Sequence, residues 1–172
     1  MNNIKVSKKL SYLLRHNPED LNMDKNGWCF VDEVLKKVGV SFVQLENIVA
    51  TNNKKRFSFN EEKTKIRANQ GHSIQVNVQL KKTVPPKTLY HGTTPRIKDQ
   101  ILKKGLLKMN RQHVHLSADK ETAIKVGKRH CRGNEKPWIV EINTTPMMLD
   151  NIDFYLSENG VWLTDFVDKK YL

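Results

Sequence analysis

A pair of adjacent prolines is the feature that most constrains how this chain can fold. The stretch "KKTVPPK" (residues 81–87) carries two positive charges just before Pro85-Pro86. Proline fixes its own φ and disfavours the helical region for the residue before it, so two in succession favour an extended linker. At 172 residues the chain is long enough for one ordinary domain or two small ones. The proline pair therefore predicts two domains, residues 1–82 and residues 83–172.

Both predicted domains are basic. Residues 1–82 carry 15 Lys and Arg against 8 Asp and Glu, residues 83–172 carry 15 against 10, and the whole chain has a formal net charge of +12. A summed positive potential attracts polyanions such as nucleic acid, although a merely soluble basic protein would have the same composition. Two well-separated cysteines, the lack of a recognisable signal peptide and the lack of a long apolar run predict a cytoplasmic protein with no disulfide framework and no membrane partner.

Apolar side chains at helical spacing predict short helices in residues 1–82. In the first helix Ser7 can supply the N-cap and Pro18 stops the helix, and one apolar stripe is formed by Val6, Leu10, Leu13 and Leu14. A second helix follows "GWCFV", Gly39 suits the position after its end, and its apolar face holds Val34, Leu35 and Val38. A third helix begins at a capping box of Ser41 and Gln44, and it is expected to bury Phe42, Leu45, Ile48 and Val49.

A predicted β-hairpin follows these helices. "RFSF" and "KIRA" alternate around the turn-prone "NEEK", and "IQVNVQL" is a further expected strand with Ile74, Val76, Val78 and Leu80 facing inward. Short helices and a hairpin in a basic half favour a winged-helix-like module that binds nucleic acid.

The second half has the pattern of short strands broken by helices. Thr94 caps one expected helix, which has Pro95 in its first turn and Gly105 past its end, and "ADKETAIKVGK" forms another. The strands are "TLYHGTT", "HVHLS", "WIVEI", "FYL" and "VWLT", and the last two are joined by the turn sequence "SENG". This order predicts an α+β lobe with a mixed or antiparallel sheet.

Polar side chains that could carry chemistry occur in separate groups. Arg15 and His16 end the first helix, Arg67 and His72 bracket a glycine, His91 ends a strand just before Gly92 and Thr93, and His113 and His115 share one side of a strand next to Arg111.

Each group also has a simpler explanation. The arginines could be ordinary surface cations. A zinc site could be formed by His113 and His115 with His130 and Cys131, although the spacing lacks the paired pattern of structural zinc. The tryptophans, Trp28, Trp138 and Trp162, are expected in the core rather than at a binding surface.

Taken together, the motifs resemble a known enzyme family. From about Lys8 to the C-terminus, the chain is similar in motif order and spacing to the RNA 2′-phosphotransferases, and the motifs are "LSYLLRHNP", "GWCFVDEVL", "RFSF", "IRANQGHS", "LYHGT", "GLLKMNRQHVHLS", "VGKRH" and "NGVWLTDFV". The resemblance implies a winged-helix-like RNA lobe followed by an ADP-ribosyltransferase-like lobe. It implies a monomeric, cytoplasmic enzyme that uses NAD as co-substrate, needs no metal and removes an internal 2′-phosphate of the tRNA splice-junction type.

The resemblance also implies site residues. The family's catalytic set matches Arg15, His16, Arg67 and Arg111. The NAD-binding positions match His91, Gly92, Thr93, His115, Ser117 and Val161, and Val161 stands where many relatives that modify proteins have Glu.

Other functions remain open on the sequence alone. An ADP-ribosyltransferase that caps a terminal phosphate of DNA or RNA would stop after the first chemical step. A non-catalytic winged-helix regulator would account for the basic first half, but it leaves "YHGT" and "HVHLS" unexplained.

Overall fold

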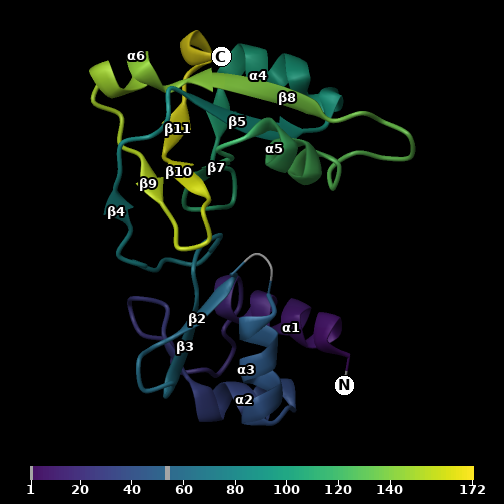
Figure 1. Cartoon of the computed structure of the whole chain (residues 1–172), viewed down its shortest axis with the longest axis vertical. Helices are drawn as coiled ribbons and strands as arrows, with labels where there is room; N and C mark the ends of the chain where they lie inside the picture. The colour runs from purple at the N-terminus through teal and green to yellow at the C-terminus, as the bar shows by residue number, and fades with distance from the viewer. Residues whose placement is uncertain (1, 53–54) are drawn as a thin grey trace. The chain divides into compact units, whose positions relative to one another are not determined.

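The chain folds into two compact units, residues 1–79 and residues 80–172 (Figure 1). The computed structural model describes residues 2–52 and 55–172. The division falls after Gln79, whereas the sequence analysis placed it after Lys82. Each unit combines helices with small antiparallel sheets, which confirms the α+β class. No helix in these described ranges is long and apolar enough to cross a membrane.

Helices of the first unit pack their predicted apolar stripes into one core. α1 (Asn3–Arg15) buries the stripe predicted for it, α2 (Val31–Val38) ends at Gly39 with a left-handed φ of 71°, and both contribute to the core of this unit. The expected cap of α1 was wrong. The side chain of Asn2 accepts a hydrogen bond from the backbone N–H of Ile4 at 2.8 Å, and Ser7 lies within the helix. Asn2 has the extended backbone of an N-cap, with φ −68° and ψ 122°, whereas Ser7 already lies in the helix.

The third helix, α3 (Phe42–Ala50), begins as predicted. The hydroxyl of Ser41 accepts a hydrogen bond from the backbone N–H of Gln44 at 3.3 Å. Only part of its expected apolar face is buried, because Leu45 and Ile48 lie in the core while Phe42 is 36% exposed and Val49 is partly exposed. The ring of Phe42 lies instead against Phe59, with the ring centroids 6.0 Å apart.

The predicted hairpin is present. β2 (Phe57–Phe59) pairs antiparallel with β3 (Lys65–Ala68), and β1 (Cys29–Phe30) pairs with the other edge of β3. Ile66 and Ala68 are buried, so Arg67 lies on the opposite face of the strand, paired in register with Ser58.

The expected strand "IQVNVQL" does not form. In residues 74–80 burial still alternates, because the even-numbered apolar residues are more buried than their neighbours. These residues pair with no strand in the described part of the chain. Gln79 has a φ of 57°, which breaks an extended backbone. The ladder starts only at β4 (Lys81–Lys82), which pairs with β9 (Tyr155–Leu156).

The second unit is built on short antiparallel ladders with helices beside them. β5 (Thr88–Thr93) pairs with β8 (Trp138–Asn143), and a separate sheet has the order β4-β9-β10-β7. The predicted elements among these are β5, β7 (Val114–Leu116), β8, β9, β10 (Trp162–Thr164), α4 (Lys98–Lys104) and α5 (Lys120–Gly127). Other elements of this unit were not predicted from the sequence: β6 (Leu106–Leu107), α6 (Thr144–Leu149), β11 (Phe166–Val167) and the 3₁₀ turn η2 (Lys169–Tyr171).

Two turn predictions hold in this unit. Thr94 caps the 3₁₀ turn η1 (Pro95–Ile97), which leads into α4, and Gly105 ends α4 with a φ of 76°. Gly160 in the β9–β10 turn also has a φ of 76°.

Helix α5 lies against strand β5 at unusually close range. A Cβ built on Gly92 would lie 1.7 Å from the carbonyl oxygen of Ala123, and one built on Gly127 would lie 2.7 Å from the Cβ of Pro137. Glycine at these two positions therefore allows the backbone of α5 to touch the strand that carries His91.

Candidate active site

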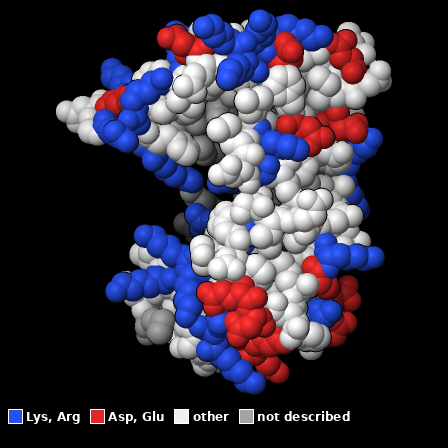
Figure 2. Space-filling model, turned by 180° about the vertical axis from the view of Figure 1, so that it is seen from behind, with Lys and Arg blue, Asp and Glu red and all other residues white. Residues whose placement is uncertain are grey.

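Positive charge alone does not locate a site on this protein. Figure 2 shows Lys and Arg side chains on both units, with acidic side chains interspersed among them on the visible face. The formal net charge of +12 is therefore spread over the chain. The contacts of individual side chains are more informative.

The end of α1 places Arg15 and His16. Arg15 is only 8% exposed, and its guanidinium carbon lies 5.9 Å from the ring centre of Phe57. Nδ1 of His16 lies 3.0 Å from the hydroxyl oxygen of Ser73, and the backbone N–H of Ser73 donates to the carbonyl of Arg15 at 2.9 Å. Ser73 thus orients the ring of His16 and holds the backbone of Arg15, and the Arg15 side chain lies against Phe57.

Arg67 is held over an aromatic face. Its guanidinium carbon lies 4.4 Å from the ring centre of Trp28, within the range of a cation–π contact. Trp28 therefore binds the guanidinium of Arg67 on its ring face and is only partly buried, whereas the sequence predicted a core residue. Trp138 is partly buried and packs against the core of the second unit, with the ammonium of Lys98 5.6 Å from its ring centre, and Trp162 is buried as expected.

His72 shows that these cations share one region of the first unit. Its side chain is 2% exposed, and burial lowers its pKa to about 4, with further lowering by the positive charges of Arg15, His16 and Arg67. Its Nε2 atom is buried and has no hydrogen-bond partner among residues 2–52 and 55–172. The structure therefore brings Arg15, His16 and Arg67 around a neutral imidazole.

In the second unit, His91 and His115 are linked directly. Nδ1 of His91 lies 2.9 Å from the carbonyl oxygen of His115, and burial lowers the pKa of His91. Nη1 of Arg111 lies 3.1 Å from Nδ1 of His115. Three of the predicted site residues of this unit are thus joined by two short contacts.

The other predicted NAD-binding residues lie on the adjacent strands. Gly92 and Thr93 follow His91 in β5, and Ser117 exchanges two backbone hydrogen bonds with Tyr90, at 2.7 and 2.9 Å. Trp162 pairs with Leu116, which places the preceding Val161 beside Ser117. The six residues therefore gather where β5, β7 and β10 run side by side.

A zinc site finds no support in the geometry. No group of three or more His, Cys, Asp or Glu side chains in the described part of the chain is arranged to hold a metal ion. His113 contacts the ring of Tyr155, with centroids 5.8 Å apart, and burial lowers its pKa against the opposing effect of Asp165. Cys131 is a free thiol.

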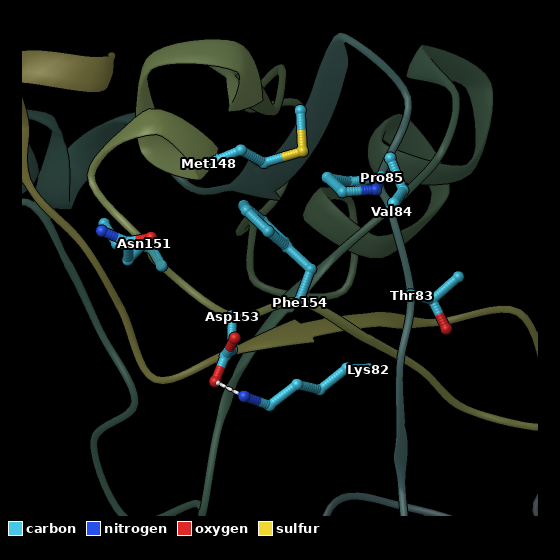
Figure 3. A pocket seen from close by; sticks show the side chains of 9 residues that line it. Lys82, Thr83, Val84, Pro85, Met148, Asn151, Asp153 and Phe154 are labelled. Atoms are coloured by element: carbon cyan, nitrogen blue, oxygen red, sulfur yellow. Dashed lines mark ion pairs between the residues drawn. The ribbon is translucent and has the colours of Figure 1, made fainter.

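A surface hollow of about 460 Å³ lies elsewhere in the second unit. Figure 3 shows Met148, Phe154 and Pro85 turned toward one another in this hollow and the ion pair between Lys82 and Asp153 at its edge. None of the predicted site residues lines it.

Sequence reasoning assigned no role to some residues that shape the site. Trp28 and Ser73 contact the predicted catalytic residues across 39 and 57 positions of sequence, respectively. Local patterning carries no signal for such long-range contacts. His72 was singled out beside Arg67, but its burial between the cations could not be foreseen.

Comparison with known proteins identifies the chain's family. The model of the RNA 2′-phosphotransferase, Tpt1 / KptA family matches residues 1–166. A probable RNA 2′-phosphotransferase of Fusobacterium nucleatum is 53% identical over 99% of this chain and 98% of its own length. A protein of Flavobacterium johnsoniae with the same name is 51% identical over 97% of this chain and 93% of its own length. One of Acaryochloris marina, also with this name, is 47% identical over 96% of this chain and 93% of its own length.

These matches first define a class, the transferases that act on an RNA 2′-phosphate. The chain belongs to the RNA 2′-phosphotransferase, Tpt1 / KptA family. The resemblance drawn from the sequence motifs is thereby confirmed.

Proposed function

We propose that the protein removes an internal RNA 2′-phosphate, of the kind left at a tRNA splice junction, in an NAD-dependent reaction. The products are RNA with a 2′-hydroxyl, ADP-ribose 1″,2″-cyclic phosphate and nicotinamide, and the RNA passes through a 2′-phospho-ADP-ribosylated state. The observation that carries the proposal is that Arg15 and Arg67 lie at the same hairpin, Arg15 against Phe57 of β2 and Arg67 in β3 opposite the neighbouring Ser58, and that the charges of both lower the pKa of the buried His72. A cluster of guanidinium groups is well suited to bind a phosphate dianion.

The residues at β5, β7 and β10 fit a dinucleotide bearing ribose hydroxyl groups. The rings of His91 and His115 supply hydrogen-bonding groups at short range, and the lack of a side chain at Gly92 lets α5 pack directly against β5 beside them. Thr93, Ser117 and Val161 complete the proposed binding positions. When bound, NAD supplies an electrophilic ribose carbon whose leaving group, nicotinamide, departs as a neutral base.

No residue has to activate the nucleophile in the first step. A phosphate monoester is already anionic near neutral pH, so it can attack without a general base. This explains why the apolar Val161 can stand where a carboxylate would otherwise activate a hydroxyl acceptor.

In the second step, negative charge develops on the phosphoryl oxygens. We propose that Arg15, Arg67 and Arg111 stabilise this charge, because a planar guanidinium can bind two oxygens at once. As the 2″-hydroxyl of the ribose bonds to phosphorus, the bond from phosphorus to the RNA 2′-oxygen breaks and that oxygen gains a proton. His16 is the proposed group that protonates the departing RNA oxygen or assists proton transfer from the attacking hydroxyl, and its contact with Ser73 orients the ring. The three guanidinium groups supply the positive charge, so we expect no requirement for a divalent metal.

The direct test uses an RNA carrying one ³²P-labelled internal 2′-phosphate. With NAD, we expect the label to move to ADP-ribose 1″,2″-cyclic phosphate and the RNA to gain a 2′-hydroxyl, with no conversion when NAD is omitted. Release of the label as inorganic phosphate without NAD would contradict the proposal. A stable ADP-ribose adduct on a terminal phosphate, detected by mass spectrometry, would favour the alternative capping activity.

Dependence on metal can be tested in the same assay. We expect turnover to be unchanged in excess chelator. Loss of turnover that is restored by zinc would contradict the proposed role of the arginines.

A further inference from the structure

We infer that Arg111 is a positioning residue that fixes the ring of His115 as its Nε2–H tautomer, and that the backbone of His115 fixes His91 as the opposite, Nδ1–H tautomer. The ligand-binding consequence of this inference rests on the proposed function. The tautomers themselves follow from the contacts within the second unit.

The first contact defines His115. Arginine has N–H donors and no acceptor, so the nitrogen that lies 3.1 Å from its Nη1 must accept the hydrogen bond. Nδ1 of His115 therefore carries a lone pair, and the ring proton is on Nε2. An imidazolium at this position would place an N–H against the guanidinium, so the same contact favours the neutral ring.

The second contact defines His91. A backbone carbonyl can only accept a hydrogen bond, so Nδ1 of His91, which lies 2.9 Å from the carbonyl oxygen of His115, must carry a proton. Burial lowers the pKa of His91, which keeps the ring neutral and leaves the lone pair on Nε2. This is the less populated tautomer of an unconstrained neutral imidazole, so its presence requires the carbonyl contact.

Backbone pairing in the sheet fixes the position of His115, whose carbonyl and ring make the two contacts. His115 lies in β7 and pairs in register with Leu163 of β10, while the bridge between Tyr90 and Ser117 joins β7 to β5. The carbonyl of His115 is thus placed beside His91 by backbone pairing on both sides. The ring of His115, in contrast, is contacted by a side chain, that of Arg111.

The two rings then have complementary hydrogen-bonding capacity. Nε2 of His91 is an acceptor and Nε2 of His115 is a donor. This combination suits a ligand with hydroxyl groups, each of which can donate or accept. Arg111 has five N–H donors and uses one of them on His115, so the contact is compatible with its proposed binding of a phosphoryl oxygen.

The test is NMR spectroscopy of the full-length, ¹⁵N-labelled protein without NAD or RNA. Long-range ¹H–¹⁵N correlation of the imidazole groups distinguishes the tautomers, and the variants His91→Gln and His115→Gln assign the signals. We expect the Nδ1–H pattern for His91, the Nε2–H pattern for His115, and a His115 Nδ1 resonance shifted upfield by its hydrogen bond.

Substitution of Arg111 separates the two contacts. In Arg111→Ala, the His115 Nδ1 resonance should move to the position of an unbonded nitrogen, while His91 keeps its Nδ1–H pattern. Arg111→Lys, which retains a donor, should restore part of the shift. The matched control is Arg96→Ala, because Arg96 donates to the backbone carbonyl of His130 at 2.8 Å and should leave both rings unchanged.

The inference is overturned by a Nδ1–H or imidazolium pattern for His115 in the unmodified protein, or by an unchanged His115 signal in Arg111→Ala. Failure of the proposed function would be visible separately. It would appear as the expected tautomers in a protein that does not bind NAD.

Discussion

The two units place their functional side chains in opposite electrostatic settings. In the first unit, Arg15 and Arg67 lie over aromatic rings, and the pKa of His72 is lowered first by burial and then by the nearby positive charges. In the second unit, His91 and His115 are held by hydrogen bonds, one of them from an exposed arginine. The first arrangement concentrates positive charge, which suits a phosphate, and the second orients neutral donors and acceptors, which suits hydroxyl groups. The difference is consistent with the proposal that the first unit binds the RNA phosphate and the second binds NAD.

The largest expected effect concerns the cation cluster of the first unit. Arg67→Ala should lower turnover of 2′-phosphorylated RNA by about 10²- to 10³-fold or more, because a charge-stabilising donor is lost. Arg67→Lys should recover only part of the activity, because it keeps the charge and loses the planar fork. The assay is single-turnover kinetics with saturating NAD.

Arg56→Ala is the matched control for this substitution. Arg56 belongs to the same unit and donates to the side chain of Asn52 at 3.3 Å, so it should affect turnover far less. Near-normal turnover in Arg67→Ala, with an unchanged unfolding transition, would remove Arg67 from the proposed phosphate site.

The next effect concerns the scaffold of the second unit. Gly92→Ala should destabilise the protein by about 3 kcal/mol, because the new methyl group would overlap the carbonyl of Ala123 in α5. The measurement is the free energy of unfolding in urea. Gly133→Asn is the control, since a Cβ at Gly133 meets no atom within 4 Å and Asn tolerates its positive φ. Equal stability of the two variants would show that α5 and β5 are not in close contact.

The pH dependence of the unfolding free energy tests the environment of His72 in the first unit. The pKa of His72 is about 4 in the folded protein and 6.5 for a histidine in an unfolded chain, so the unfolded chain binds more protons between these values. Stability from this group is therefore present above pH 6.5 and is lost as the pH falls toward 4. From pH 7 to pH 5 the loss is about 2 kcal/mol.

His91 and His113 also have lowered pKa values, so the informative quantity is the difference between proteins. His72→Gln should show a shallower decrease in unfolding free energy between pH 7 and pH 5 than the unmodified protein. The same decrease in both would mean that burial and the nearby cations do not lower the pKa of His72 in the folded protein.

The smallest effect compares helix caps in the two units. The carboxylate of Asp119 accepts from the backbone N–H of Thr122 at 2.7 Å at the start of α5, and Ser41 accepts from Gln44 at 3.3 Å at the start of α3. Each substitution by Ala should cost about 1 kcal/mol, with the larger loss at Asp119 because its cap is charged and shorter. Urea unfolding gives both values, and a larger loss in Ser41→Ala would reverse this order.

Elements set by local chemistry could be predicted from the sequence. The stripe of α1, the cap at Ser41, the left-handed Gly39 and the hairpin of β2 and β3 each depend on residues close together in the chain. The strand expected at residues 74–80 failed because alternation specifies which side chains turn inward but cannot supply a pairing partner. The two-residue strands β1, β6 and β11 were missed because tertiary pairing alone defines them.

The candidate site shows the same limit. Motif likeness located Arg15, His16, Arg67 and Arg111, but not the ring beneath Arg67, because Trp28 reaches it through the fold of the sheet. The contact between Arg111 and His115 spans only four positions, yet it lies in a turn whose geometry no sequence pattern specifies.

Binding of each substrate alone to two variants most directly tests the proposal that the first unit binds the RNA phosphate and the second binds NAD. Isothermal titration of Arg67→Ala should give an unchanged Kd for NAD and a strongly weakened Kd for 2′-phosphorylated RNA. His91→Ala should show the reverse. Equal weakening of NAD and RNA in either variant, with the protein still folded, would contradict the assignment of phosphate recognition to the first unit and NAD recognition to the second.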